Sequence, residues 1–347
     1  MKKIPVAILG ATGMVGQKFI ELLINHPWFE IAALAASERS EGKKYKDAAS
    51  WRMSTTLPAS IGDMQVKSCK PDLACKIAFS GLDSDVAGEI EQAFASAGYV
   101  VISNSKNHRM DPHVPLLIPE LNSDHLELVK GQNYGKGMIV TNPNCSVIGL
   151  ATALKPLADR WGIEKVNVVT MQAVSGAGYP GVASFDILDN VIPFISGEEE
   201  KVEAEPLKIL GTYRDGRVHP YEMVISAQCN RVAVMDGHVE CASVKLKKSA
   251  TMDEIVKAWN SFRGEPQQLD LPLAPTQPIV YMENERHPQP KLHRLLDKGM
   301  AVSVGRLRKC PILDWKFVLL SHNTIRGAAG CAILNAELML KKGYIHA

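Results

Sequence analysis

The chain has no long hydrophobic run and no excess of one charge, and its first residues do not have the pattern expected of an export signal. Its 347 residues include no apolar stretch of about 18 residues, the length that a membrane-spanning helix needs. The 39 Lys and Arg nearly balance the 37 Asp and Glu, so a net charge of +2 gives no electrostatic reason to expect nucleic acid or an acidic membrane as a partner. The N-terminus lacks the longer apolar region and the cleavage site of a signal peptide, and we expect a cytoplasmic protein.

Paired cysteines and metal-binding patterns are missing as well. The seven cysteines are spread through the sequence, and no two have the close spacing of a zinc site or a redox dithiol. An odd number of cysteines in a cytosolic chain indicates free thiols. The ten histidines form no His-x-x-x-His pattern with a neighbouring acid, and we expect no metal.

The length and composition suit a globular protein of two domains. A chain of 347 residues is longer than one hydrophobic core usually supports, and 46% apolar with 22% charged residues is enough to bury a sizeable core. Short apolar strands at 29–36, 77–80 and 99–103 alternate with a helical segment at 84–97. Such alternation predicts a parallel sheet with helices on both faces, an α/β domain that we place at residues 1–143.

A glycine-rich turn follows the first strand, residues 4–9. Its sequence is Gly10-Ala11-Thr12-Gly13-Met14-Val15-Gly16, and apolar residues at helical spacing follow it. Glycines in a strand–turn–helix unit let the backbone approach a pyrophosphate, which lies at the helix N-terminus. The spacing is Gly-x-x-Gly-x-x-Gly rather than Gly-x-Gly-x-x-Gly, and an ordinary tight turn has the same composition. The position after the first strand favours dinucleotide binding.

The end of the second strand favours NADP over NAD. An NAD site usually carries an acid there, which holds the ribose diol. This chain has Ser37, Arg39 and Ser40, with Lys43 beyond, and these side chains suit a 2′-phosphate. Glu38 weakens the argument, and the alternative is a solvated, charged loop.

Cys145 occupies the start of a predicted helix. A buried strand ends at residue 140, a turn follows at 142–144, and helical spacing begins at Ser146 and continues to about residue 159. Free N–H groups and the helix dipole would lower the thiol pKa at that position and produce a nucleophile. The alternative from this stretch alone is a buried structural thiol.

The second half of the chain predicts a mixed sheet, so we expect an α+β domain at residues 144–322. Strands are expected at 166–174, 218–234, 239–246, 302–307 and 315–320, and the proline-rich stretch 273–290 is expected to be irregular. Residues 196–211 are acidic and then helical, with Glu205 and Lys208 three residues apart, a spacing most often seen in surface salt bridges. A final helix is expected to start at Asn323.

Four motifs in this order resemble those of the aspartate-β-semialdehyde dehydrogenases, particularly their archaeal and fungal-type branch. They are Asn142–Ser146, Gln172 with the glycine cluster 175–181, Arg231 with Gly237-His238, and His322-Asn323-Thr324. The resemblance covers essentially the whole chain. It implies a Rossmann domain at 1–143 that the C-terminal helix 323–347 completes, a catalytic and dimerisation domain at 144–322, and a homodimer or homotetramer.

The resemblance also implies a reaction. In that family L-aspartyl-4-phosphate is reduced and dephosphorylated with NADPH, giving aspartate 4-semialdehyde and phosphate for the synthesis of lysine, threonine, methionine and isoleucine. Cys145 matches the nucleophile that forms an acyl thioester. His238 matches the acid/base, and Gln172 a catalytic amide that orients the substrate.

Binding residues are implied by the same matches. Arg231 corresponds to the clamp for the substrate α-carboxylate and Glu205 to the partner of its α-ammonium, whereas Arg109, Asn144 and Lys208 correspond to a phosphate pocket. For Arg109 the alternative is a solvated loop charge, with Lys106 in its role. The residues that match cofactor contacts are Gly10, Thr12, Gly13, Met14, Val15, Gly16, Ser37, Arg39, Ser40, Ser80, Ser175, Gly176, Asn323 and Thr324.

Two departures from the family pattern and three alternative functions remain open. Glu41 replaces the small residue expected after Ser40, and Cys310 and Cys331 have no assigned role. Malonyl-CoA reductase resembles the same branch and shares the thioester chemistry, while N-acetyl-γ-glutamyl-phosphate reductase would lack the Arg231 and Glu205 pair. A non-catalytic dinucleotide-binding regulator would keep the first domain but would not need both Cys145 and His238.

Overall fold

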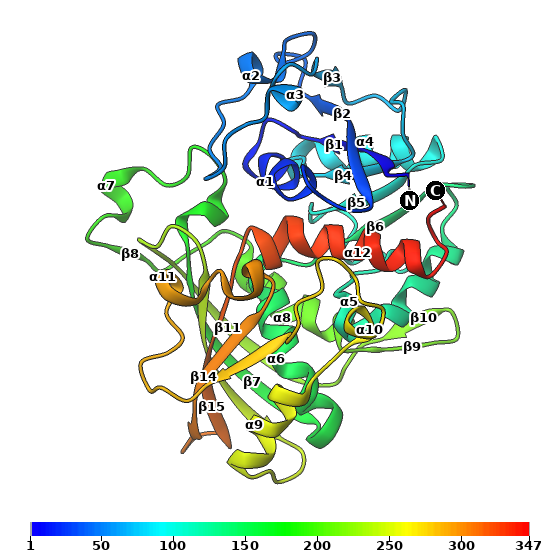
Figure 1. Ribbon diagram of the computed structural model, residues 1–347. Helices are drawn as coiled ribbons and strands as arrows, with labels where there is room; N and C mark the ends of the chain where they lie inside the picture. Colours follow the sequence, from blue (N-terminus) through cyan, green and yellow to red (C-terminus); the bar gives the residue numbers. More distant parts are fainter. Residues whose placement is uncertain (1, 347) are drawn as a thin grey trace. The chain divides into compact units, whose positions relative to one another are not determined.

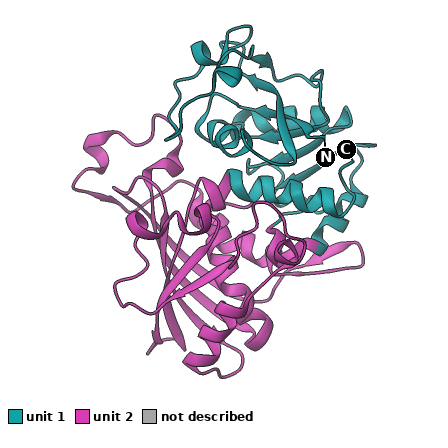
Figure 2. Cartoon of the chain, in the orientation of Figure 1, with its two compact units in different colours: residues 1–117, 124–142, 329–347 teal, residues 118–123, 143–328 magenta. Residues whose placement is uncertain are grey.

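The protein divides into two compact units. The computed structural model describes residues 2–346, and its first unit comprises Met1–Leu117, Asp124–Asn142 and Ala329–Ala347, while the second comprises Ile118–Ser123 and Pro143–Ala328 (Figure 2). The chain thus changes unit at 142/143, one residue before the predicted boundary at 143/144, and at 328/329, six residues after the predicted boundary at 322/323. The short insertion 118–123 in the second unit has no counterpart in the prediction.

A six-stranded parallel sheet forms the first unit (Figure 1). Its strand order is β3-β2-β1-β4-β5-β6, with β1 (Ile4–Leu9), β2 (Phe29–Ala36), β3 (Lys67–Ser68), β4 (Ile77–Ser80), β5 (Val100–Ser103) and β6 (Met138–Thr141). Every residue of β4 and β5 is buried, as expected for strands that helices cover on both faces. The predicted strand–turn–helix alternation is confirmed, and the order reverses between β1 and β4, where dinucleotides bind in such sheets.

The first unit has three longer α-helices, α1, α4 and α12, and several short helical segments. All of its helical segments are given next. They are α1 (Met14–Leu23), α2 (Tyr45–Ala48), α3 (Ala59–Gly62), α4 (Ser84–Ser96), a 3₁₀ segment at Ser123–Gly131 and α12 (Gly330–Lys341). α12 is buried from Gly330 to Met339, and Glu337 on it lies 2.7 Å from His26 Nε2. The C-terminal helix therefore belongs to the core of this unit.

The predicted start of the final helix at Asn323 is wrong. A π-helical turn occupies Ile325–Ala329, and the α-helix begins only at Gly330 and ends at Lys341. In the π turn the Gly327 N–H donates to the carbonyl of His322 at 2.8 Å, five residues earlier, in place of the usual partner four residues earlier.

The second unit contains a seven-stranded mixed sheet of order β13-β14-β15-β12-β7-β11-β8. Its strands are β7 (Ile163–Gln172), β8 (Val191–Ile192), β11 (Val224–Val232), β12 (His238–Leu246), β13 (Ile279–Met282), β14 (Val302–Lys309) and β15 (Trp315–Ser321), and a separate hairpin joins β9 (Thr212–Arg214) to β10 (Arg217–His219). The stretch 273–290 is thus not wholly irregular, because β13 within it pairs in parallel with β14.

The second unit also contains helices, of which α6 and α8 pack side by side on one face of this sheet. They are α5 (Pro119–Asn122), α6 (Cys145–Trp161), α7 (Ser184–Ile187), α8 (Glu198–Ile209), α9 (Met252–Ser261), α10 (Glu265–Gln268) and α11 (Pro290–His293), with 3₁₀ turns at Val174–Ala177 and Leu296–Gly299. α6 packs on β12 and β15, and α8 packs on β11. Along β12 buried residues alternate with partly exposed ones, so the opposite face of the sheet is open.

No helix among residues 2–346 is both long enough and apolar enough to cross a membrane.

A buried ion pair anchors the π-helical turn within the second unit. Arg326 donates from both terminal nitrogens to the two oxygens of Glu120 on α5, at 2.8 and 3.0 Å, and both side chains are almost fully buried. Removal of one charge from such a pair leaves the other unpaired in a medium of low dielectric constant.

We expect Glu120→Gln to lower the free energy of unfolding by about 3–5 kcal/mol. Denaturant titration of the purified variant measures this loss. Asp159→Asn, which removes the surface pair of Asp159 with Lys155 on α6, is the matched control and should cost about 0–1 kcal/mol. Equal losses in the two variants would contradict the structural role given to the Arg326–Glu120 pair.

Candidate active site

Cys145 is the first residue of α6, as the sequence predicted. The N-cap is Asn144, whose Oδ1 accepts hydrogen bonds from the N–H groups of Ser146 at 2.9 Å and Val147 at 3.3 Å. Cys145 is partly exposed, which contradicts the alternative of a buried structural thiol.

His238 faces the thiol. Its Nε2 lies 3.2 Å from Cys145 Sγ, while its Nδ1 accepts the backbone N–H of Ala173 at 3.1 Å. Because Nδ1 accepts a hydrogen bond, the proton of the neutral ring is on Nε2 and points towards the sulfur. Burial, together with the smaller effects of the nearby Arg231 and His322, lowers the pKa of His238 to about 3, so the ring is neutral at physiological pH.

Arg231 and Gln172 lie side by side next to this pair. They are register partners in β11 and β7, and both side chains are buried. Arg231 Nη1 donates to the carbonyl oxygen of Ala173 at 2.7 Å. The backbone of Ala173 therefore orients both side chains, His238 through its N–H and Arg231 through its carbonyl oxygen. Burial lowers the pKa of Arg231 from its usual value, although a guanidinium remains charged.

The turn after β7 closes over these side chains. A Cβ added to Gly176 would lie 2.9 Å from Arg231 Nη1 and 3.1 Å from His238 Cε1, so the backbone at Gly176 passes directly beside them. Asn323 holds this turn, since its Nδ2 donates to Ser175 Oγ and its Oδ1 accepts from the Gly237 N–H, both at 2.8 Å. Thr324 is largely buried beside His322.

Glu205 and Lys208 on α8 are both buried, so a surface salt bridge is excluded. Glu205 Oε2 accepts the backbone N–H of Asn144 at 2.7 Å, which places this carboxylate directly behind the nucleophile. The structure therefore brings together, in the second unit, the predicted residues Cys145, His238, Gln172, Arg231, Glu205 and Asn144, with Lys208 one turn further along α8.

The geometry of Asn144 differs from that expected for a phosphate ligand. Its Oδ1 caps α6, and its Nδ2 donates to Glu198 Oε1 at 2.9 Å. Both ends of the carboxamide are thus engaged within the protein. The side chain as it stands supports the first turn of α6.

Sequence reasoning missed Glu198, Glu120, Arg326 and Gly327. Glu198 is one of three consecutive acids, and nothing in the pattern distinguishes it from its exposed neighbour Glu200. Gly327 offered a clearer signal, a glycine inside a predicted helix. A Cβ at Gly327 would lie 2.8 Å from Cys145 Cβ and 3.0 Å from the Cys145 carbonyl oxygen. The π-helical turn therefore packs directly against the nucleophile.

In the first unit the β1–α1 turn fits a dinucleotide pyrophosphate. Gly10 has φ +73°, and a Cβ there would lie 2.6 Å from the Gly81 carbonyl oxygen; at Gly16 it would lie 2.2 Å from that of Gly10. Both glycines are needed for close approach of the backbone segments. No side chain caps the N-terminus of α1 at Gly13, which leaves that end of the helix to an anion.

The other predicted residues of this unit follow neighbouring strands. Ser37, Arg39 and Ser40 come directly after β2, with Arg39 exposed, and Ser80 is the buried last residue of β4. Since β1, β2 and β4 are parallel neighbours, their carboxyl ends share one edge of the sheet with the glycine turn. Arg109 is largely buried, and its Nη2 donates to the Asn104 carbonyl at 2.8 Å, so it is not a solvated loop charge.

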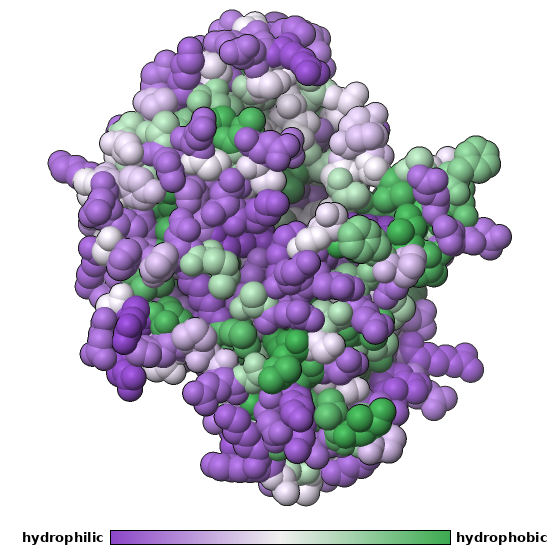
Figure 3. Space-filling view, turned by 180° about the vertical axis from the view of Figure 1, so that it is seen from behind, coloured by the Kyte–Doolittle hydropathy of each residue, from purple (hydrophilic) through white to green (hydrophobic). Residues whose placement is uncertain are grey.

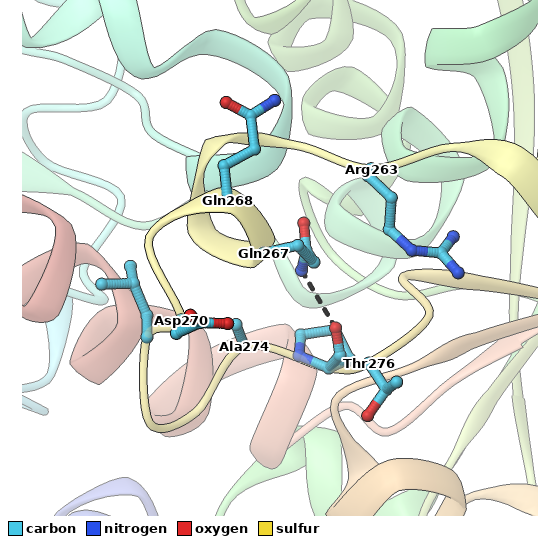
Figure 4. Close-up of a pocket in the computed structure, with 8 residues that line it drawn as sticks. Arg263, Gln267, Gln268, Asp270, Ala274 and Thr276 are labelled. Carbon is cyan, nitrogen blue, oxygen red and sulfur yellow. Dashed lines mark hydrogen bonds between the residues drawn. The ribbon is translucent and has the colours of Figure 1, made fainter.

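A surface depression elsewhere in the second unit is not this site. It has a volume of about 490 Å³ and is lined by residues of the loop after α9, including Arg263, Asp270 and Thr276 (Figure 4). Gln267 at its centre donates to the Pro275 carbonyl at 3.1 Å. None of the predicted catalytic residues lines it. Within residues 2–346, no group of three His, Cys, Asp or Glu side chains is arranged to hold a metal ion.

Comparisons with known proteins give consistent matches over the whole chain. The family model described as "Semialdehyde dehydrogenase, NAD binding domain" matches residues 5–129, and "Semialdehyde dehydrogenase, dimerisation domain" matches residues 154–326. The aspartate-semialdehyde dehydrogenase of Schizosaccharomyces pombe is 51% identical, with 97% of this chain and 98% of the relative covered. That of Methanothermobacter thermautotrophicus is 49% identical, with 96% and 98% covered.

A solved structure agrees with these sequence matches. It is an aspartate semialdehyde dehydrogenase with NADP from Candida albicans, 44% identical, which superimposes with a TM-score of 0.92 and covers 99% of this chain and 100% of its own. Fungal and archaeal relatives are therefore both close to this sequence.

We expect Gly327→Ala to slow alkylation of Cys145 about tenfold, because the added methyl group displaces the thiolate from its hydrogen-bond donor. The rate is measured with iodoacetamide and peptide mass spectrometry, which separates Cys145 from the other cysteines. Gly62→Ala is the control, because its Cβ would meet Leu57 Cδ2 at an ordinary 3.5 Å. An unchanged rate in Gly327→Ala would show that the π turn does not constrain Cys145.

The neutral, buried His238 makes stability depend on pH. Its folded pKa is depressed, so between pH 6.5 and about 3 the unfolded chain binds a proton that the folded protein does not, and stability falls as pH falls. From pH 7 to 5 we expect the wild type to lose on the order of 2 kcal/mol more than His238→Asn. Denaturant titrations at the two pH values measure the difference, and parallel losses would mean that His238 is protonated in the folded protein.

Proposed function

The chain belongs to the aspartate-semialdehyde dehydrogenase family, and we propose that it reduces L-aspartyl-4-phosphate to L-aspartate 4-semialdehyde with NADPH through a thioester at Cys145. It is an oxidoreductase. One observation carries the residue assignment: Cys145 Sγ at the start of α6 lies 3.2 Å from His238 Nε2, beside the Arg231 guanidinium. The relatives found give no support to malonyl-CoA reductase or to a non-catalytic regulator.

In the first half of the proposed reaction, the Cys145 thiolate attacks the acyl carbon of the substrate. A C–S bond forms, and the C–O bond to phosphate then breaks, with the electron pair leaving on inorganic phosphate. A thiolate suits both this attack and its later departure. The helix N-terminus favours the anionic sulfur before the attack.

His238 acts as a hydrogen-bond donor in this proposal. With Nδ1 engaged by the Ala173 N–H, the Nε2–H stabilises the thiolate and then the oxygen that becomes negative next to it. A base role at Nε2 would require the other tautomer, which would place the Nδ1 proton against the Ala173 N–H. Of the acid/base role expected from the sequence, we therefore keep for His238 only the donation of a hydrogen bond from Nε2.

In the second half the thioester carbonyl is reduced and the C–S bond breaks, which returns the Cys145 thiolate and releases the aldehyde. NADPH, when bound, supplies the hydride for this step. We assign its pyrophosphate to Gly10–Gly16 and its 2′-phosphate to Ser37, Arg39 and Ser40, with further contacts from Ser80, Ser175, Gly176, Asn323 and Thr324. The glycine sterics and the uncapped start of α1 support the first of these assignments.

Substrate recognition follows from the charges. We assign the α-carboxylate to Arg231, whose Nη1 is held by Ala173, and the α-ammonium to Glu205. Gln172, beside Arg231 in the sheet, orients the substrate. The phosphate is assigned to Lys208 and Arg109.

The product serves the synthesis of lysine, threonine, methionine and isoleucine. The seven free thiols support a cytoplasmic location for the protein.

Self-association is part of the proposal, as a homodimer or homotetramer. The match to a dimerisation domain and the open face of the seven-stranded sheet support it. Exposed apolar side chains also gather around α7, which projects at the right of Figure 3. They are Tyr179, Phe185, Leu188, Val191 and Phe194, and apolar surface of this kind marks contact with another protein.

The reverse reaction tests the function. Wild type with aspartate semialdehyde, phosphate and NADP should form NADPH in a phosphate-dependent manner, and Cys145→Ser should be slower on the order of 10³-fold or more. Cys310→Ser, at a partly exposed thiol in the turn between β14 and β15, should remain within about twofold of wild type.

Two results would overturn the proposal. No phosphate-dependent NADPH formation by wild type would refute the reaction, and full activity of Cys145→Ser would refute the nucleophile. Oxidation of NADPH with malonyl-CoA in place of the acyl phosphate would favour the rival enzyme.

A further inference from the structure

Glu198 makes a buried contact with the residue that precedes the nucleophile. It is the first residue of α8, and its side chain is largely buried. Oε1 accepts a hydrogen bond from Asn144 Nδ2 at 2.9 Å, and Oε2 lies 3.1 Å from Lys201 Nζ. The neighbouring acids on α8 do something else, because Glu199 and Glu203 accept backbone N–H groups of Cys229 and Ala227 on β11.

The contact determines how the Asn144 carboxamide is oriented. The oxygen and nitrogen of an amide are nearly equal in size, so packing alone does not choose between its two orientations. A carboxylate only accepts hydrogen bonds, and Asn144 must therefore turn Nδ2 towards Glu198. This leaves Oδ1 facing the N–H groups of Ser146 and Val147, where it caps α6.

α8 holds Asn144 at a second point. Glu205 accepts its backbone N–H at 2.7 Å while Glu198 accepts from its side chain, so two carboxylates of one helix hold one residue. Glu205 already has a role in substrate binding. Glu198 has no role in the proposed chemistry, and its two hydrogen-bond partners are Lys201 and the N-cap of the helix that carries Cys145.

We propose that Glu198 is a positioning residue for Cys145, acting through the Asn144 carboxamide. Because Cys145 is adjacent to Asn144, a turn of the amide would release the first turn of α6 and move Sγ away from His238 Nε2. This proposal rests on the proposed function for its kinetic consequences, but the position of the thiol can be measured without any substrate.

A simpler role for Glu198 also deserves a control. Acids at a helix start stabilise the helix through its dipole, and Glu199 and Glu200 share that position. Glu200→Ala removes an exposed acid from the same turn and is the matched control. Glu198→Gln removes the charge but keeps an oxygen that can accept from Asn144, so it separates hydrogen bonding from charge.

The first experiment measures alkylation of Cys145 by iodoacetamide, followed by mass spectrometry, in the full-length protein. We expect Glu198→Ala to slow the reaction about tenfold or more, as for loss of a hydrogen bond to a charged group. Glu198→Gln and Glu200→Ala should stay within about threefold of wild type. Equal rates in Glu198→Ala and Glu200→Ala, or an equal fall in Glu198→Gln, would overturn the proposal.

Steady-state kinetics of the reverse reaction give the second readout. Glu198→Ala should lower kcat about tenfold with KM for aspartate semialdehyde unchanged within about twofold, because binding groups remain in place. In an Asn144→Ser background, which keeps a capping oxygen but lacks the amide, Glu198→Ala should have no further effect. A full tenfold loss in that background would place the action of Glu198 elsewhere.

Two further comparisons keep the result interpretable. If Glu198→Ala does not fold, Glu198→Asp keeps the charge but withdraws the acceptor, and it should show the same slow alkylation. An inactive wild type with normal Cys145 alkylation would refute the proposed function alone, whereas an active wild type with unaffected Glu198 variants would refute the positioning role alone.

Discussion

The short contact between Cys145 Sγ and His238 Nε2 is the constraint on which the proposed chemistry depends. It joins the first residue of α6 to the first residue of β12, and the Ala173 N–H holds the imidazole. Ala173 is central because its N–H sets the tautomer of His238 while its carbonyl holds Arg231. A change in the backbone after β7 would therefore disturb the hydrogen-bond donor and the substrate clamp together.

The polar side chains around this contact are largely buried. Asn144, Glu198, Glu205, Arg231 and His238 are all largely buried, and each makes a hydrogen bond to backbone or to another of the group. Burial of such groups is costly unless their partners are in place. The same hydrogen bonds that offset this cost also fix the geometry, so stability and orientation have a common origin here.

Much of the architecture could be predicted from the sequence because local pattern determined it. The strands 4–9, 29–36 and 77–80 have the predicted bounds, and helix α6 begins where the turn before Cys145 ends. The start of the last helix was missed, because backbone hydrogen bonds define the π turn at Ile325–Ala329, and the apolar pattern does not reveal them. β13 was missed because its pairing with β14 is a tertiary event within a proline-rich stretch.

The residues that position the site were harder to foresee for a physical reason. Chemistry demands a residue type, so Cys145, His238 and Arg231 could be singled out by what a thiolate, an imidazole or a guanidinium can do. Support demands only a donor or acceptor at the right point in space, which many residue types provide. Glu198 and Glu200 have the same side chain two positions apart, and only the fold turns one towards Asn144 and the other to solvent. Roles of this kind become visible only when the hydrogen-bond partners of each buried polar group are traced.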